Sequence, residues 1–389
     1  MYQKVFLQQG KEMPIKHRHH WIFNGAIARK PNAQNGQIVQ VVSGNNEILG
    51  HGYYNNDTVI AIRMLNFNTQ DPIESLKQNI RKAAEMRKKI FNEKETNTYR
   101  VINGEGDFIP GLIVDKYGDV IVIQIATIGM EQLKPIVIEE LKSIYNPKCI
   151  YEKSNMSARR KDGLENFEGI LYGELNGDTE VLENKIKFTI DFLKAQKTGL
   201  FIDMREMRHL VGEFSKGQDL LNCFSYTGGF SLYAARNGAK TTTSIDIDPD
   251  AVDYAKKNFE LNGYTGNNHK FIAQDVFEFL RNDPLQYSFI ILDPPAFAKK
   301  KEDIEGAKRG YAEINRLALS KIPSGSFLLT CSCSYHVSRE MHEEIVLRAA
   351  RDAKRDIKII HKQRLAFDHP ININHNEVDY LKSILLYVS

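Results

Sequence analysis

The fold is decided by the stretch Asp219-Leu-Leu-Asn-Cys-Phe-Ser-Tyr-Thr-Gly-Gly-Phe230, an apolar strand that enters a glycine-containing turn and then a helix. On both sides of this stretch, apolar strands and amphipathic helices alternate along the chain. The expected strands cover 219–224, 241–246, 269–273, 287–292 and 325–331, and the expected helices cover 228–237, 249–262, 305–321 and 338–353. Such alternation predicts a doubly wound α/β fold, with a parallel sheet covered by helices on both faces.

The residues before this region follow other patterns. Residues 1–70 contain short strands at 36–42, 47–54 and 58–65 between Asn/Gly-rich turns, which predicts a small all-β domain. Residues 71–190 combine two amphipathic helices with a hairpin and further strands, which predicts a central α+β domain. The α/β domain then spans 191–389, and three domains suit a chain of 389 residues.

Composition excludes several classes of protein. Hydrophobic residues make up 42% and charged residues 26% of the chain, without an apolar run long enough to span a bilayer, so we expect no membrane partner. The opening residues lack the layout of a secretory signal, and the four cysteines do not resemble a disulfide framework, so we expect a cytoplasmic protein. Cys331 and Cys333 lack a second cysteine pair, so no metal is predicted. The sequence leaves a homodimer open.

Two basic regions suit a polyanionic partner. Residues 1–70 carry seven Lys and Arg against three acidic residues, an excess of four positive charges. The run Lys299-Lys300-Lys301, followed by Arg309 and Tyr311, would steer backbone phosphates and stack on a base. A solvated surface explains either region equally well.

In an open α/β sheet, ligands bind at the carboxyl ends of the strands. Gly228 and Gly229 follow the first strand and would allow close backbone approach to a ligand, although an ordinary tight turn is the alternative. The turn is not GxGxxG, which favours a nucleoside carrying an amino acid over a dinucleotide. Asp246 ends the second strand about 20 residues later, where a ribose diol would lie. We expect Asp248 to cap the helix that begins at Pro249.

The third and fourth strands also end in acidic residues. Asp275 would accept a hydrogen bond from an adenine amino group or cap the helix that follows. Asp293-Pro294-Pro295 comes directly after a buried strand, and its two prolines stiffen the chain so that Asp293 faces the crevice. A carboxylate held in this way suits a planar base that carries an amino group.

With these motifs, the chain resembles the class I methyltransferases that modify large-subunit ribosomal RNA, of the RlmI and RlmK type. The resemblance covers nearly the whole chain and rests on TGLFIDMREMR (198–208), the 219–230 stretch, SIDIDPDAV, QDVFEFL, ILDPPAFAKKK and TCSCS. It implies an N-terminal PUA domain over residues 1–70, to which the stretch from Arg18-His-His-Trp21 to Gly25 is similar, followed by a central α+β domain and a Rossmann-like methyltransferase domain. It further implies S-adenosylmethionine as the cofactor and ribosomal RNA as the partner.

The resemblance also implies the residues of the cofactor site. Phe201, Asp203 and Arg205 would lie at the methionine end, where Arg205 would pair with the cofactor carboxylate or, alternatively, with Asp203 or Glu206. The remaining residues expected to bind the cofactor are Asn222, Phe224, Tyr226, Thr227, Gly228, Asp246, Ile247, Gln274, Asp275, Val276, Asp293 and Pro294.

The fifth strand delivers a thiol at its carboxyl end. Carbon 5 of cytosine is a poor nucleophile, so its methylation requires a thiolate that adds at carbon 6. Cys331 and Cys333 share a strand face, and Cys333, nearer the strand end, is the candidate nucleophile. The resemblance supports it, because the family places its nucleophile in an S-C-S motif, here at 332–334. A buried inert cysteine is the alternative.

The thiol predicts formation of 5-methylcytosine, with Cys333 and Asp293 as catalytic residues, and the resemblance implies 23S ribosomal RNA as the substrate. Another group of RNA cytosine methyltransferases has a second cysteine where this chain has Ala296, so Asp293, a water or another base must remove the carbon-5 proton. The target base would be unstacked or single-stranded. Two alternatives stay open: methylation of a guanine nitrogen without a cysteine nucleophile, and a non-catalytic RNA-binding assembly factor.

Overall fold

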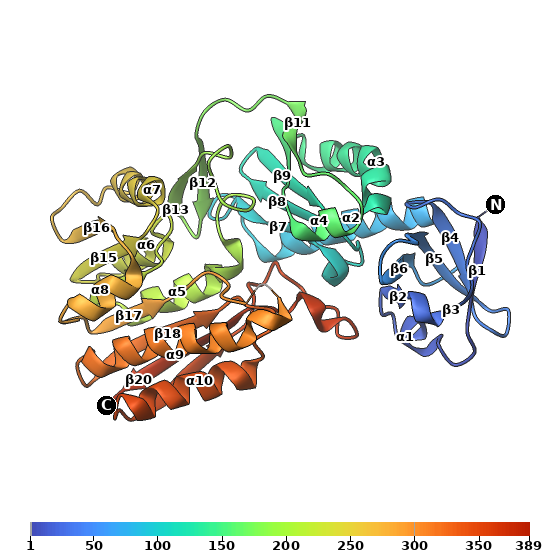
Figure 1. Cartoon of the computed structure of the whole chain (residues 1–389). Helices are drawn as coiled ribbons and strands as arrows, with labels where there is room; N and C mark the ends of the chain where they lie inside the picture. Colours follow the sequence, from blue (N-terminus) through green and yellow to red (C-terminus); the bar gives the residue numbers. More distant parts are fainter. Residues whose placement is uncertain (1, 299) are drawn as a thin grey trace. The chain divides into compact units, whose positions relative to one another are not determined.

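The computed structural model describes residues 2–298 and 300–389 (Figure 1). These residues form two compact units. The first contains the chain up to Lys185 together with Ile190–Ile202 and Phe367–Val378, and the second contains Ile186–Thr189, Asp203–Ala366 and Asp379–Ser389. Segments 190–202 and 367–378 therefore belong to the first unit, although nearly all of their residues fall within the range predicted for the third domain. The boundaries at 70 and 190 stay predictions.

The second unit contains the predicted doubly wound sheet. Its seven strands lie in the order β16 (His269–Ala273), β15 (Thr241–Asp246), β14 (Asp219–Cys223), β17 (Phe289–Leu292), β18 (Ser326–Ser332), β20 (Lys382–Val388) and β19 (Ile357–Gln363). The first five are mutually parallel, and β20 runs antiparallel to both of its neighbours. The strand order reverses between β14 and β17, which makes their carboxyl ends the expected ligand site.

Helices cover both faces of this sheet. All four residues of β17 are buried, and because successive strand residues point to opposite faces, neither face meets solvent there. One group of helices consists of α5 (Arg205–Phe214), α6 (Gly229–Arg236) and α7 (Pro249–Leu261), and a second consists of α8 (Val276–Asn282), α9 (Ile304–Lys321) and α10 (Arg339–Asp352). The predicted α/β class is thus confirmed.

The first unit contains two sheets with separate hydrophobic cores. The first has the order β2 (Trp21–Phe23), β6 (Ile60–Asn66), β5 (Ile48–Tyr54), β4 (Ile38–Val42), β1 (Gln3–Leu7) and β3 (Ile27–Arg29). The second has the order β11 (Phe167–Gly173), β10 (Cys149–Ser154), β9 (Val120–Ile125), β8 (Leu112–Tyr117) and β7 (Thr98–Asn103), with α2 (Pro72–Ile90) and α3 (Ile128–Tyr145). The short helices α1 (Met13–Lys16) and α4 (Ser157–Lys161) and the strand β12 (Thr179–Glu183) also belong to the first unit, whereas most of β13 (Ile186–Ile190) belongs to the second. Each helix among the described residues is too short or too polar to cross a membrane.

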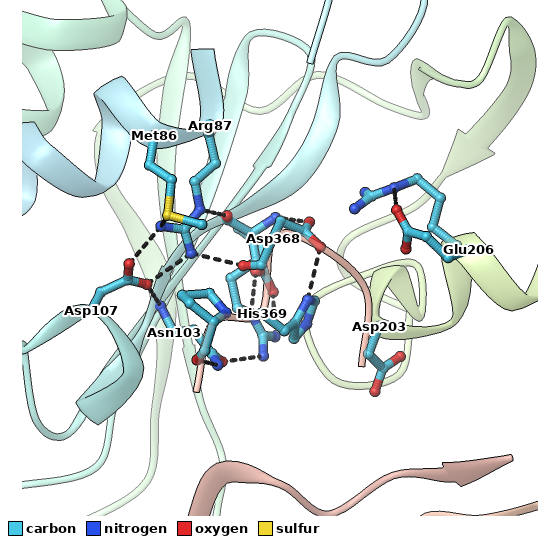
Figure 2. Close-up of polar contacts among 12 residues, drawn as sticks. Met86, Arg87, Asn103, Asp107, Asp203, Glu206, Asp368 and His369 are labelled. Carbon is cyan, nitrogen blue, oxygen red and sulfur yellow. Dashed lines mark hydrogen bonds and ion pairs between the residues drawn. The ribbon is translucent and has the colours of Figure 1, made fainter. Parts of the chain in front are cut away.

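A buried ionic network anchors segment 367–378 within the first unit (Figure 2). The guanidinium of Arg87, on α2, is fully buried and donates to both carboxylate oxygens of Asp107 at 2.6 and 2.8 Å. It also donates to the carbonyl oxygens of Arg100 and Asp368 at 2.8 and 2.7 Å. The Asp368 carboxylate in turn accepts the backbone N–H of Arg100 at 2.7 Å. Two charges at this depth are tolerated because each is paired and hydrogen-bonded.

Candidate cofactor and catalytic site

The turn after β14 has an unusual backbone. Phe224 and Tyr226 adopt positive φ angles of 59° and 46°, and Gly228 has a φ of 78°. Left-handed conformations are costly for aromatic residues and cluster at ligand sites. A Cβ on Gly228 would lie 2.9 Å from the Cβ of Ala255, so only glycine fits between the turn and α7. The surrounding structure thus maintains a strained turn where the cofactor was predicted.

Asp246 connects this turn to the end of β15. Its carboxylate accepts the backbone N–H groups of Tyr226 at 2.8 Å and Asp248 at 3.1 Å, and its carbonyl accepts that of Gln274 at 2.9 Å. Next to it, Ile247 leaves 69% of its side chain exposed, which is unusual for an isoleucine beside a buried strand. A half-exposed carboxylate beside an exposed apolar side chain suits a ribose diol and the adenine attached to it.

Other predicted residues support the site from within. The Asn222 side chain is fully buried and donates to Ser231 Oγ at 3.1 Å, which lies 2.7 Å from Ser244 Oγ. Val276 is also buried and packs into the hydrophobic core. Thr227 accepts a hydrogen bond at its carbonyl from the Asn258 side chain at 3.0 Å. These contacts fix the strand ends and the turn rather than present side chains at the surface.

Two acidic residues act as helix caps. Asp248 accepts the N–H of Asp250 at 3.0 Å and caps α7, as predicted. Asp275 accepts the N–H of Glu278 at 2.9 Å through Oδ1 and caps α8, the alternative that its sequence position left open. Its predicted contact with adenine stays a prediction, for which Oδ2 is the other available atom.

Asp203, just before α5, and Arg205, the first residue of α5, belong to the second unit. Asp203 accepts a hydrogen bond from the Tyr380 hydroxyl, and its carbonyl accepts the Ala366 N–H at 3.1 Å. Arg205 is buried and donates from Nε to Glu206 at 3.3 Å, which is the ion pair expected as the alternative to cofactor binding. Phe201 belongs to the first unit, where Lys197 Nζ lies 4.6 Å from its ring centroid. Roles for these residues at the methionine end stay predictions.

Cys333 differs from the other three cysteines. Cys149, Cys223 and Cys331 are buried, whereas Cys333 is partly exposed just beyond the end of β18. Burial raises the thiol pKa of Cys223 and of Cys331, so both stay protonated near pH 7. The Cys333 Sγ donates to the carbonyl of Pro294 at 3.7 Å. The structure therefore brings the predicted nucleophile to the Asp293-Pro294-Pro295 turn.

The serine after Cys333 fixes this arrangement. The Ser334 hydroxyl lies 2.9 Å from the Tyr311 hydroxyl and accepts the backbone N–H of Ala298 at 3.1 Å. It thus joins α9 and the loop that follows Pro294 to the end of β18. Tyr311 is fully buried, so the expectation that it stacks on an RNA base is wrong. In the adjacent lysine run, Lys299 lies outside the described residues, and the Lys300 N–H is bonded to Asp303 at 2.9 Å.

Lys382 is a site residue that no sequence motif indicates. It begins β20 opposite Ser332 and is 5% exposed. Its ammonium donates to the carbonyls of Ser334 at 2.6 Å and Tyr380 at 2.7 Å. Burial lowers the pKa of Lys382 to about 8, and its attraction to a Cys333 thiolate opposes that shift. A buried lysine so close to a cysteine has no signature in sequence spacing, because the strands that carry them are remote along the chain.

The residues present fit S-adenosylmethionine. Glycine at position 228 lets the strained turn at 224–228 pack closely against α7, and Asp246 and Ile247 offer a carboxylate and an apolar surface beside this turn. Asp293 and Cys333 follow β17 and β18, strands that pair side by side. A cofactor at the end of β14 would therefore lie near the candidate nucleophile, since β14 and β17 also pair.

Solved structures share the fold of the whole chain. A chain from Streptococcus mutans, whose description names a SAM-dependent methyltransferase, matches with a TM-score of 0.83 at 23% identity. The match covers 98% of this chain and 99% of the other. At this level of identity the likeness establishes the fold alone.

Sequence comparisons establish the family. Residues 5–67 match the PUA-like domain and residues 160–363 match the S-adenosylmethionine-dependent methyltransferase family. The protein named ribosomal RNA large subunit methyltransferase I from Alteromonas mediterranea is 34% identical over 395 residues, which cover 100% of each chain. The protein of the same name from Aeromonas salmonicida is 35% identical over 390 residues and 98% of each chain. This chain therefore belongs to the S-adenosylmethionine-dependent methyltransferase family and carries a PUA-like N-terminal domain.

Proposed function

We propose that this chain methylates carbon 5 of a cytosine in large-subunit ribosomal RNA, with Cys333 as the covalent nucleophile. The RNA is inferred from the full-length relatives, which are named for the large ribosomal subunit, and from the PUA-like domain. The target atom is inferred from Cys333, the one partly exposed cysteine, whose Sγ lies 3.7 Å from the Pro294 carbonyl. A methyltransferase that acts on a base nitrogen has no need of a thiol in this position.

The chemistry assigns a task to each group. When bound, S-adenosylmethionine would supply an electrophilic methyl group, whose bond to sulfur breaks as it is transferred and leaves S-adenosylhomocysteine. The Cys333 thiolate adds to carbon 6 of the cytosine, and the electron pair of the 5,6 double bond makes carbon 5 nucleophilic. Once carbon 5 carries the methyl group, loss of its proton to a base restores the double bond and expels the thiolate. Asp293 stabilises the protonated N3 side of the ring through its charge.

We assign Lys382 the task of stabilising the thiolate. A neighbouring cation lowers the pKa of a thiol and increases its reactive fraction. The ammonium of Lys382 is desolvated, and the carbonyls of Ser334 and Tyr380 hold it beside the residue that follows Cys333. Lys382 acts through Cys333 and is therefore a positioning residue.

The decisive experiment is nucleoside mass spectrometry. Ribosomal RNA from cells that lack this enzyme is incubated with labelled S-adenosylmethionine and with the wild type or with Cys333→Ala. We expect label in 5-methylcytosine with the wild type and a loss of at least about 1,000-fold with Cys333→Ala, since the covalent route is removed. Cys149→Ala, which changes a buried cysteine of the first unit, is the control that should retain activity.

Other outcomes would point to a different function. Label on a guanine nitrogen that survives Cys333→Ala would overturn the proposed target and make Cys333 structural. Cofactor binding without transfer to any base would favour an RNA-binding assembly factor.

A further inference from the structure

Three potential metal ligands meet in the first unit, away from the candidate catalytic residues in sequence. His19 precedes β2, and His375 and Glu377 lie in segment 367–378. One ligand atom of each residue lies within 4.8 Å of the other two. His19 and Glu377 are 358 positions apart, so the fold rather than local spacing brings them together.

The distances suit a tetrahedral site. His19 Nε2 lies 3.4 Å from Glu377 Oε1, and His375 Nε2 lies 3.4 Å from Glu377 Oε2. Zinc bonds of about 2.0 to 2.1 Å in a tetrahedral arrangement separate two ligand atoms by about 3.4 Å. A metal ion therefore fits between these atoms after small side-chain adjustments.

His375 needs a partner that the described residues do not supply. Its side chain is 1% exposed, and neither ring nitrogen makes a hydrogen bond to the described part of the chain. A buried polar group without a hydrogen bond costs about 1 to 3 kcal/mol. A neutral imidazole is the form that binds metals.

His19 has the supporting contact that metal-bound histidines usually have. Its Nδ1 lies 3.2 Å from the carbonyl oxygen of Trp21, and this bond would leave Nε2 unprotonated and directed at Glu377. The opposite tautomer would accept the Trp21 N–H instead. Both His19 and Glu377 are partly exposed, and His19 also lines a surface cavity together with Trp21. A metal ion can therefore reach these two ligands from solvent.

We propose that His19, His375 and Glu377 form a binding site for a divalent transition metal ion, with zinc as the best fit. Two imidazoles and one carboxylate match its preferred donors. The ion would tie segment 367–378 to the strand that contains Trp21, which makes the site structural. The cysteine pattern, from which no metal was predicted, gives no information about this site, because its ligands are two histidines and a glutamate. This inference is independent of the proposed function.

Trp21 offers a direct readout, because it is the only tryptophan in the chain. Its ring centroid lies 4.5 Å from that of His375. Titration of the EDTA-treated, full-length protein with Co²⁺ should quench Trp21 fluorescence with a stoichiometry of one. Addition of Zn²⁺ should then displace Co²⁺ and restore the fluorescence, because Zn²⁺ is closed-shell and binds the same donors.

Two variants test the ligands. His375→Phe keeps a ring against Trp21 and should weaken Co²⁺ binding at least about 100-fold, since it removes one of three ligands. His17→Phe, which changes an exposed histidine two positions from His19, should bind as the wild type does. Absence of stoichiometric quenching in the wild type, or equal Co²⁺ affinity of the wild type and His375→Phe, would overturn the site.

Discussion

At the scale of single residues, Lys382 determines a pH dependence. Its ammonium has a pKa of about 8, against 10.5 in an exposed lysine. Below pH 8 the positive charge is present and supports the Cys333 thiolate; as the pH rises through 8 the charge and its support are lost. We expect the rate to rise as Cys333 ionises and to fall as Lys382 deprotonates, which single-turnover methylation across pH 6 to 10 would measure.

Variants separate this effect from a purely structural one. In Lys382→Met the pH–rate profile should no longer fall at high pH. The rate should also drop about 10-fold for each unit by which the pKa of the Cys333 thiol rises. Lys382→Arg keeps a permanent charge and should retain activity without the limb near pH 8. Lys321 also donates to three backbone carbonyls, at the end of α9, so Lys321→Met is the matched control. A pH profile unchanged in Lys382→Met would remove the proposed role.

Gly228 lies in the strained turn after β14, and its replacement should affect both stability and cofactor binding. In Gly228→Ala, the new Cβ meets Ala255 at 2.9 Å and the φ of 78° becomes strained. Gly217 has a similar φ of 74° but open space around it. Both variants should lose about 1 to 2 kcal/mol of stability from left-handed strain. Only Gly228→Ala should also weaken S-adenosylmethionine binding in calorimetry, by about 10-fold or more; equal affinities in the two variants would show that the turn does not contact the cofactor.

At the scale of elements, the Arg87–Asp107 pair joins α2 to the turn after β7. Asp107→Ala would leave a fully buried guanidinium without its carboxylate, and we expect a loss of about 3 to 5 kcal/mol in unfolding free energy. Glu74→Ala removes an exposed ion pair with Lys77 on the same helix and should change the unfolding free energy little. Urea unfolding followed by circular dichroism would measure both. Similar unfolding free energies for the two variants would mean that hydrogen bonds to the backbone carbonyls are enough to stabilise the Arg87 guanidinium.

The sequence predicted most elements because their periodicity is local. Strands β14 to β18 and helices α6, α7, α9 and α10 have the expected positions within a few residues. Strands β19 and β20 were both missed. The residues of β19 are mostly exposed, and β20 pairs antiparallel with both of its neighbours, which the predicted alternation of helices and parallel strands does not include. Asp246 and Cys333 were identifiable because they follow predicted strands. Lys382 and His375 were not, because their partners are set by tertiary contacts.

At the scale of the whole molecule, the chain crosses between its two units several times. The second unit contains the chain up to Ala366. The next segment, Phe367–Val378, belongs to the first unit, and the residues from Asp379 onward, which include β20, belong to the second unit again. Local patterns of apolar residues do not show that a segment packs into another unit. For this reason they predict one contiguous domain over 191–389. The buried guanidinium of Arg87 is hydrogen-bonded to the Asp368 carbonyl. This bond gives a physical reason why segment 367–378 belongs to the first unit.

The pairing of β18 with β20 has one more consequence. Ser332 lies opposite Lys382 in a continuous antiparallel ladder that runs from Ser326 to Ser332. A slip of one residue would turn the lysine to the opposite face of the sheet and bring Ser383 or Leu381 in its place. The register of the ladder therefore determines which residue of β20 lies opposite Ser332, and with it the position of the ammonium group that donates to the Ser334 carbonyl.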